Sequence, residues 1–73
     1  MSLLHPLRVA AYAGASHPEY PTAVWLQARR LEVQTVIRQW RTPDALHFLV
    51  EVENLGRVEL IYHVDAWYIR GNN

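Results

Sequence analysis

From residue 22 onward, apolar and polar residues alternate in short runs, as they do in half-buried β-strands. Val, Ile, Trp, Tyr and Leu dominate these runs, and turn-forming residues separate them at short intervals. The pattern predicts strands at about 23–28, 30–40, 46–53, 57–64 and 66–70. No helical period extends beyond a turn or two. The chain is therefore expected to belong to the all-β class.

The clearest predicted element is a hairpin over residues 46–64. One apolar row is formed by Leu46, Phe48, Val50 and Val52, and the matching row by Val58, Leu60, Tyr62 and Val64. Between them, Asn54-Leu55-Gly56 is typical of a three-residue loop with Gly56 in the left-handed conformation. This loop sets Glu53 opposite Arg57, and every inward pair is then apolar. The same register sets His47 opposite His63 and Glu51 opposite Glu59.

The strand at 30–40 is less regular than the hairpin. Leu31, Val33, Thr35 and Ile37 are predicted to face inward, which leaves Val36 and Trp40 in an unusually apolar outer row. A bulge or strong bend near 34–36 would resolve this conflict. Five short antiparallel strands, one of them bent, predict a small five-stranded barrel or curled sheet. An SH3-like roll is the first choice and an OB-like barrel the second.

Residues 1–21 follow a different pattern. They contain Pro6, Pro18 and Pro21, a run of Ala, and no sustained alternation. We expect an N-terminal arm at 1–21, partly irregular, followed by a small β-barrel domain at 22–73. Leu3, Leu4, Leu7 and Val9 give the arm enough apolar surface to dock on the barrel.

The predicted outer face is too apolar to be left uncovered. It combines Val36, Trp40, Leu49 and Ile61 with charged and polar neighbours. A contiguous apolar patch of this kind marks a covered surface or a partner surface. Three interpretations are open: the chain's own arm folds over it, a second copy binds it as a homodimer, or a dedicated protein partner binds it.

Length, cysteine content and the lack of a long apolar run limit the possible classes of protein further. A chain of 73 residues has room for one domain, and a domain this small is either marginally stable alone or gains burial by pairing with another copy or a partner. The absence of cysteine excludes disulfides and fits a reducing compartment. With no apolar run long enough to span a bilayer and no recognisable signal peptide, we expect a cytoplasmic protein without membrane contact.

All seven basic residues are arginines, and seven acids balance them. Residues 1–43 carry a net charge of +3 and residues 44–73 a net charge of −3. In a small antiparallel sheet the simplest interpretation is charge pairing between strands of the two halves. A net charge of zero also argues against strong non-specific binding of nucleic acid.

A local nucleic-acid contact remains open because arginines alternate with aromatic residues. The candidate residues are Arg29, Arg30, Arg38, Trp40 and Arg41. Arginine and aromatic rings together suit single strands, since bases stack and phosphates attract cations. The structural alternative is that Trp25 and Trp67 fill the barrel core, with arginine stems covering them.

No catalytic or metal-binding constellation is predicted. His47 and His63 would supply two ligands, whereas a zinc site needs three or four. Glu51 opposite Glu59 is a like-charge pair, for which Arg38 is the natural cation, and no nucleophile accompanies it. Glycine-rich phosphate loops are absent as well. We therefore expect no enzymatic activity, no cofactor and no small-molecule substrate.

From Pro21 onward, a series of residues resembles a family of short, functionally uncharacterised bacterial β domains found chiefly in high-GC lineages. The matching positions are Pro21, Val24-Trp25, Arg29-Arg30, Val33, Val36, Trp40-Arg41, Phe48, Val50, Gly56, Val58-Glu59-Leu60, Tyr62 and Trp67. The family usually has Gly-Arg where this chain has Ala28-Arg29-Arg30. Because its members are often encoded beside translesion-polymerase and DNA-repair genes, the resemblance implies a repair-linked accessory role, with DNA or a DNA-repair protein as partner. It supplies no catalytic residues.

Overall fold

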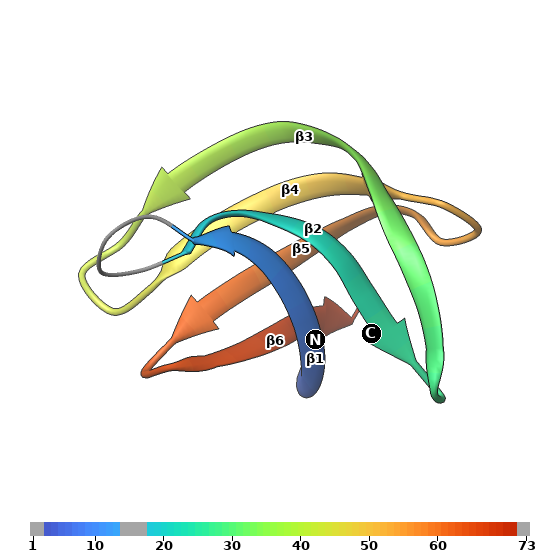
Figure 1. Cartoon of the computed structure of the whole chain (residues 1–73). Coiled ribbons are helices and arrows are strands. Elements are labelled where there is room, and N and C mark those ends of the chain that lie inside the picture. Colours follow the sequence, from blue (N-terminus) through green and yellow to red (C-terminus); the bar gives the residue numbers. More distant parts are fainter. Residues whose placement is uncertain (1–2, 14–17, 72–73) are drawn as a thin grey trace.

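The computed structural model describes residues 3–13 and 18–71. Six antiparallel strands follow one another: β1 (Leu3–Ala13), β2 (Pro18–Leu26), β3 (Arg29–Arg41), β4 (Leu46–Val52), β5 (Gly56–His63) and β6 (Ala66–Gly71). Each strand pairs with the next, and β6 pairs with β1, so the sheet closes into a barrel (Figure 1). The predicted small all-β barrel is confirmed, with six strands in place of five.

The strand order is an uninterrupted meander. An OB-fold has a Greek-key order, so the OB-like alternative does not match this topology. The described residues contain no helix long and apolar enough to cross a membrane.

The irregular arm expected at 1–21 is not what its described residues form: residues 3–13 and 18–21 belong to the barrel strands β1 and β2. Residues 1–2 and 14–17 lie outside the described part of the chain. β1 pairs with β6 over Leu3–Leu7 and with β2 over Arg8–Ala13. Leu7 and Val9 pack against the core, and Leu4 is about half exposed. The N-terminal segment is therefore part of the barrel wall and does not fold over its outer face as an arm.

The prolines that suggested an arm lie where a strand has one neighbour. Pro6 pairs with Tyr68 of β6 at a point that β2 does not reach. Pro18 and Pro21 pair with β1, and β2 begins to pair with β3 only at Ala23. A proline lacks the N–H group needed for a second ladder, so such edge positions tolerate it.

Inward-facing residues of all six strands form the core. Val24, Leu31, Phe48, Val50, Val52 and Leu60 are buried at its centre. Trp67 packs against Phe48 and Tyr62, with ring centroids 5.6 and 5.2 Å apart. Trp67 thus fills the core as the structural alternative expected.

The β4–β5 hairpin has the predicted faces in a different register. Val52 pairs with Gly56, Val50 with Val58 and Phe48 with Leu60. Compared with the prediction, the partner of each residue is shifted by two positions, because the loop is Glu53-Asn54-Leu55 and Gly56 already belongs to β5. A two-residue shift keeps each side chain on its face, so the predicted inward rows survive, while the predicted cross-strand partners are wrong. Val64 is the exception, because it lies beyond the end of β5 and is 78% exposed.

β3 carries the predicted bulge and a second one. Its pairing with β4 shifts between Val33 and Thr35 and again between Val36 and Arg38. The first bulge turns Val36 toward the core, so the prediction of Val36 as an outer residue was wrong. Thr35 and Ile37, which were expected to face inward, are exposed. The second bulge returns Arg38 and Trp40 to the outer face.

Two tight turns use the left-handed backbone region without glycine. Gln27 and Ala28 connect β2 to β3 with φ values of 51° and 66°, and Val64 and Asp65 connect β5 to β6 with 48° and 60°. Two consecutive residues with positive φ match a type I′ hairpin turn, which favours Asn and Gly. A β-branched residue such as Val64 is strained in this conformation.

Candidate functional site

β3 is the most basic and among the most exposed of the strands. It contains Arg29, Arg30, Arg38 and Arg41 and a single acid, Glu32, which gives a net charge of +3. All five of these side chains are exposed. In Figure 1, β3 arches over the barrel from the β2–β3 turn to the β3–β4 loop. Its arginines are therefore spread along an arch that solvent reaches.

The arginines of β3 differ from those of the later strands in their partners. Arg57 pairs with Glu51 (Nε–Oε1 3.7 Å) and Arg70 with Glu59 (Nε–Oε1 2.9 Å). Along β3, Arg30 pairs with Glu32 at 2.7 Å, and the other three arginines form no ion pair with the described residues. The expected charge pairing between the two halves of the chain is not what the structure shows: each pair joins residues of the same half. The positive charge of the first half therefore faces solvent.

Trp40 lies near the end of β3, where its ring contacts His47 and Arg38. It pairs across the sheet with His47 of β4, and the two rings are nearly parallel, 9° apart with centroids separated by 5.2 Å. The guanidinium carbon of Arg38 lies 5.3 Å from the centroid of the Trp40 ring. The structure thus brings three of the predicted positions, Arg38, Trp40 and Arg41, to one end of β3.

A hydrogen-bond network holds His47 in place. Its Nδ1 lies 2.9 Å from Oε2 of Glu59, and its Nε2 lies 3.1 Å from Oγ1 of Thr42. The second oxygen of Glu59 accepts a hydrogen bond from Nε of Arg70 at 2.9 Å. His47 is 9% exposed although it is on the outer face. The network therefore fixes the ring on which Trp40 stacks.

The structure corrects the predicted partners around this network. His47 lies opposite Ile61, and Glu59 lies opposite Leu49. Arg70, from β6, is the cation beside Glu59, whereas Arg38 was expected there. His63 instead has its Nδ1 2.6 Å from the carbonyl oxygen of Asp44. Among the residues placed by the structure, no three His, Asp or Glu side chains could hold a metal ion together.

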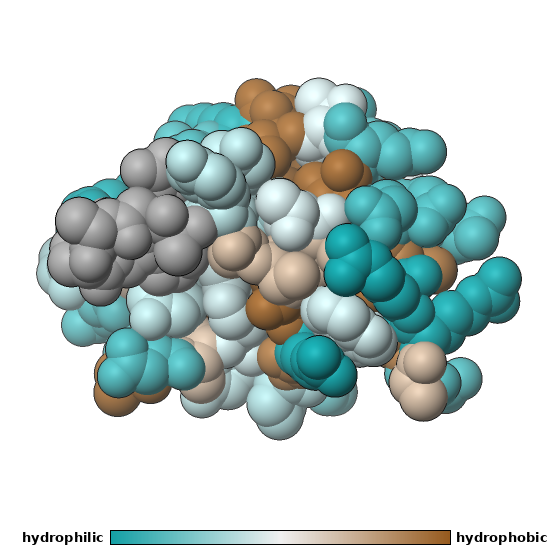
Figure 2. Space-filling model, in the orientation of Figure 1, coloured by the Kyte–Doolittle hydropathy of each residue, from teal (hydrophilic) through white to brown (hydrophobic). Residues whose placement is uncertain are grey.

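Trp25 lies at the opposite end of β3, beside the predicted Arg29-Arg30 pair. It pairs with Arg8 of β1 and Arg30 of β3 and faces outward, so the expectation that it fills the core was wrong. Its ring lies 4.2 Å from the guanidinium carbon of Arg8 and 5.2 Å from that of Arg30. Figure 2 shows hydrophilic side chains gathered at the end of the molecule where the β2–β3 turn and the β4–β5 hairpin lie.

The predicted protein interface is largely covered. Ile61 is 3% exposed and Val36 faces the core, while Leu49 and Trp40 are half-buried. The β3–β4 loop contributes to the cover, since Thr42 and Ala45 lie beside His47 and Ile61 around a shallow pocket of about 440 Å³. These four residues do not form one open apolar patch.

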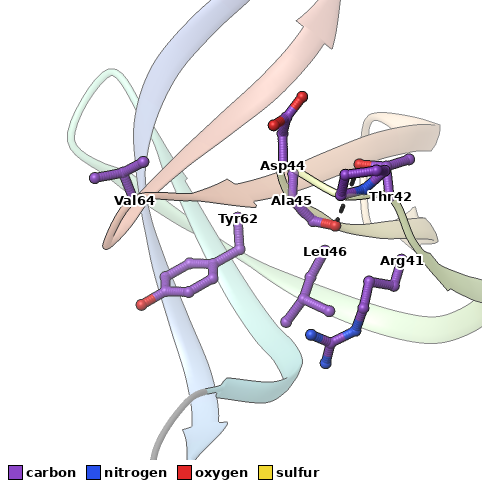
Figure 3. Close-up of a pocket in the computed structure, with 8 residues that line it drawn as sticks. Arg41, Thr42, Asp44, Ala45, Leu46, Tyr62 and Val64 are labelled. Atoms are coloured by element: carbon purple, nitrogen blue, oxygen red, sulfur yellow. Dashed lines mark hydrogen bonds between the residues drawn. The ribbon is translucent and has the colours of Figure 1, made fainter.

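A second pocket lies at the end of the barrel beside the same loop. Arg41, Leu46 and Tyr62 point to one side of it, and Asp44 points away from them (Figure 3). The Tyr62 hydroxyl donates a hydrogen bond to Oδ1 of Asp65 at 3.0 Å. This hydrogen bond to the carboxylate, together with partial burial and the negative charge of Asp65, raises the pKa of Tyr62 above its ordinary 10.0.

Four members of these two clusters were not predicted from the sequence: Arg8, Thr42, Glu59 and Arg70. Arg8 was assigned to an arm. The contacts of the other three were not predicted, because the hairpin register was wrong and the pairing of β6 with β5 was not considered. The i, i+2 spacing of Arg38 and Trp40 on a strand was the available signal, because it puts both on one face.

Comparison with models of protein families, with curated proteins and with solved structures gives no match. The family resemblance, the SH3-like roll and the cytoplasmic location therefore stay predictions.

Proposed function

We propose that this small β-barrel is a non-enzymatic nucleic-acid-binding module that acts as an accessory in DNA repair or a related transaction. The observation that supports it most is the unneutralised charge of β3. Arg29, Arg38 and Arg41 are exposed and form no ion pair with the described residues. Such arginines are available to phosphate groups, whereas Arg57 and Arg70 are already engaged by acids.

Aromatic residues beside these arginines support the same proposal. Trp25 lies near the start of β3 and Trp40 near its end, and each has an arginine over its ring. Proteins that bind single strands combine a cationic track with rings on which bases stack. The repair setting comes from the family resemblance alone and is retained as part of the proposal.

The formal net charge of zero limits the strength of the contact. Acids on β4 and β5 offset the arginines at long range, and salt screens what remains within roughly 10 Å at 0.1 M. We expect measurable binding at low salt and a steep loss as salt rises. Three phosphate contacts on a single strand, one for each unpaired arginine of β3, predict a slope of log K against log salt of about −2.

Fluorescence anisotropy of a labelled single strand of about 12 nucleotides would test the proposal over about 20 to 200 mM salt. We expect Arg38→Gln and Arg41→Gln each to weaken binding and to lower the slope by about 0.7. Arg57→Gln is the matched control, because it removes the same charge from an exposed, paired arginine on β5. Equal effects of all three variants, or no binding by the unaltered protein at low salt, would contradict the proposal.

One observation favours a second candidate, a contact with another protein or with a second copy. The pocket of about 440 Å³ on the outer face has Ile61 in its lining and Leu4, 49% exposed, beside it. Light-scattering chromatography of the unaltered protein and of Leu4→Glu tests this. A dimer that Leu4→Glu separates into folded monomers would support the contact, and a monomer in both cases would exclude self-association through this surface.

A further inference from the structure

We infer that Trp40 is the base-stacking residue of β3 and that it makes the module selective for nucleic acid with unpaired bases. This inference rests on the proposed function. The inference follows from a difference between the two neighbours of the Trp40 ring. One of them is fixed by the fold, and the other is exposed and replaceable.

His47 is the fixed neighbour. It is almost fully buried, and both ring nitrogens have partners, Thr42 Oγ1 at 3.1 Å and Glu59 Oε2 at 2.9 Å. Glu59 is itself held by Arg70 at 2.9 Å. Because the Trp40 and His47 rings are nearly parallel, this rigid support orients the indole plane before any ligand arrives. A preorganised ring loses little freedom on binding.

Arg38 is the replaceable neighbour. Its side chain is exposed, its guanidinium carbon lies 5.3 Å from the Trp40 ring centroid, and it pairs with no acid in the part of the chain that the structure describes. A base can take the place of this guanidinium over the indole, and the guanidinium can turn to the phosphate of the same nucleotide. The contact of Arg38 with the indole is thereby exchanged for an ion pair with the phosphate, so neither the guanidinium nor the phosphate is left without a partner.

Trp25 lacks the fixed support that His47 gives Trp40, since no ring of the described residues stacks on it, and two arginines lie over its own ring. Arg8 lies 4.2 Å and Arg30 5.2 Å from its ring centroid, and Arg30 is anchored by Glu32 at 2.7 Å. A base would have to break that ion pair or displace the closer Arg8. Trp25 is therefore the natural comparison for Trp40: an outward tryptophan under arginine in the same barrel.

The preferred ligand class follows from the chemistry of stacking. Every base has a π-face, so the site tolerates any sequence. In a duplex that face is already stacked on neighbouring base pairs, so an intact duplex offers phosphates to the arginines and no face to Trp40. We expect single strands to bind more tightly than a duplex of equal length at equal salt.

The first experiment uses the unaltered protein. Three labelled probes of equal length are compared by anisotropy at low salt: a thymidine single strand, the same strand with abasic positions, and a duplex. The abasic strand keeps its phosphates and loses its bases. We expect about tenfold weaker binding of the abasic strand, the loss of one stacked base, and quenching of tryptophan fluorescence by the thymidine strand alone.

Variants then assign the effect. Trp40→Leu should remove the difference between thymidine and abasic strands, Trp40→Phe should keep most of it, and Trp25→Leu should leave it unchanged. Circular dichroism establishes that each variant is folded. If Trp40→Leu does not fold, quenching of tryptophan fluorescence by the thymidine strand decides the question: it should persist in Trp25→Leu and be lost in Trp40→Phe.

The outcomes separate this inference from the proposed function. Binding of all three probes with equal affinity and equal salt dependence would retain the proposed function and overturn the role of Trp40. A preference for the thymidine strand that Trp25→Leu abolishes and Trp40→Leu does not would also overturn it. No binding of any probe at low salt would overturn both.

Discussion

β3 and the β4–β5 hairpin belong to one sheet but use their residues differently. The hairpin buries Phe48, Val50 and Leu60, and its acids Glu51 and Glu59 are each paired with an arginine. β3 buries little, is interrupted by two bulges, and has arginines without acidic partners in the described structure. Charge in the hairpin contributes to the fold, whereas charge on β3 remains available for a ligand.

The largest expected difference concerns burial. Phe48→Ala should cost about 3–5 kcal/mol of unfolding free energy, which equals roughly the whole stability of a domain this small. Ile37→Ala, on β3, should cost less than about 1 kcal/mol, because Ile37 is already 41% exposed. Urea unfolding followed by circular dichroism measures both, and similar costs at the two sites would show that β3 shares the core's stability.

Removing a carboxylate should have the next largest effect. Glu59→Gln should cost about 1.5–3 kcal/mol, since it removes the charged acceptor of both Arg70 and His47. Glu32→Gln, whose pair with Arg30 is half exposed, should cost at most about 1 kcal/mol. The same urea experiment checks this, and equal costs would contradict the assignment of Glu59 as the centre of a structural network.

Substitutions at two positions with positive φ should each change the free energy of unfolding by about 1 kcal/mol, in opposite directions. Val64→Asn should stabilise the protein, because Val64 is 78% exposed and has a positive φ that suits Asn. Gly56→Ala should destabilise it through the φ of 81° alone, since an added Cβ would meet no atom within 4 Å. Thermal melts measure both, and stabilisation by Gly56→Ala would contradict this account of the hairpin loop.

The smallest expected change is in a titration. The pKa of Tyr62 is raised above 10.0, so its protonated form is favoured in the folded state. This contribution to stability is present below pH 10.0 and is lost as the pH rises through the folded-state pKa. Asp65→Asn should lower the pKa of Tyr62 toward 10.0, which phenolate absorbance against pH would show as one tyrosine titrating earlier. An unchanged titration would mean that the hydrogen bond does not form in solution.

The sequence pattern predicted the all-β barrel and most of its core because the alternation survives errors in pairing. The core residues Phe48, Val50 and Leu60 keep their face after a two-residue register shift. The bulge in β3 was predictable for a similar reason, since Val36 conflicted with the face of its neighbours. The fold class, most of the core and the bulge could therefore be predicted, because each depends on the burial of alternate residues.

Features that depend on which residues pair across neighbouring strands could not be predicted from the sequence. Glu59 meets Arg70 only because β6 lies beside β5, and the two-residue difference in loop position decides whether Glu51 faces Glu59 or Arg57. The N-terminal strand was missed because Pro6 and the alanine run give no strand signal, although one-sided pairing tolerates them. The same holds for the candidate site. Its arginines and Trp40 were predicted, whereas the stacking of Trp40 on His47 was not.

The pairing of β1 with β6 also constrains how the chain can fold. Leu3 lies opposite Gly71 and Leu7 opposite Trp67, whereas every other neighbouring pair of strands is consecutive in the chain (Figure 1). During synthesis β1 can meet β2 early, but its contact with β6 must wait until residues 66–71 have left the ribosome. Joining such distant segments carries the greatest loop-closure entropy of any pairing in the barrel and slows folding. Until β6 is in place, the edges of β1 and β5 that it covers stay unpaired, and other chains can join these exposed edges.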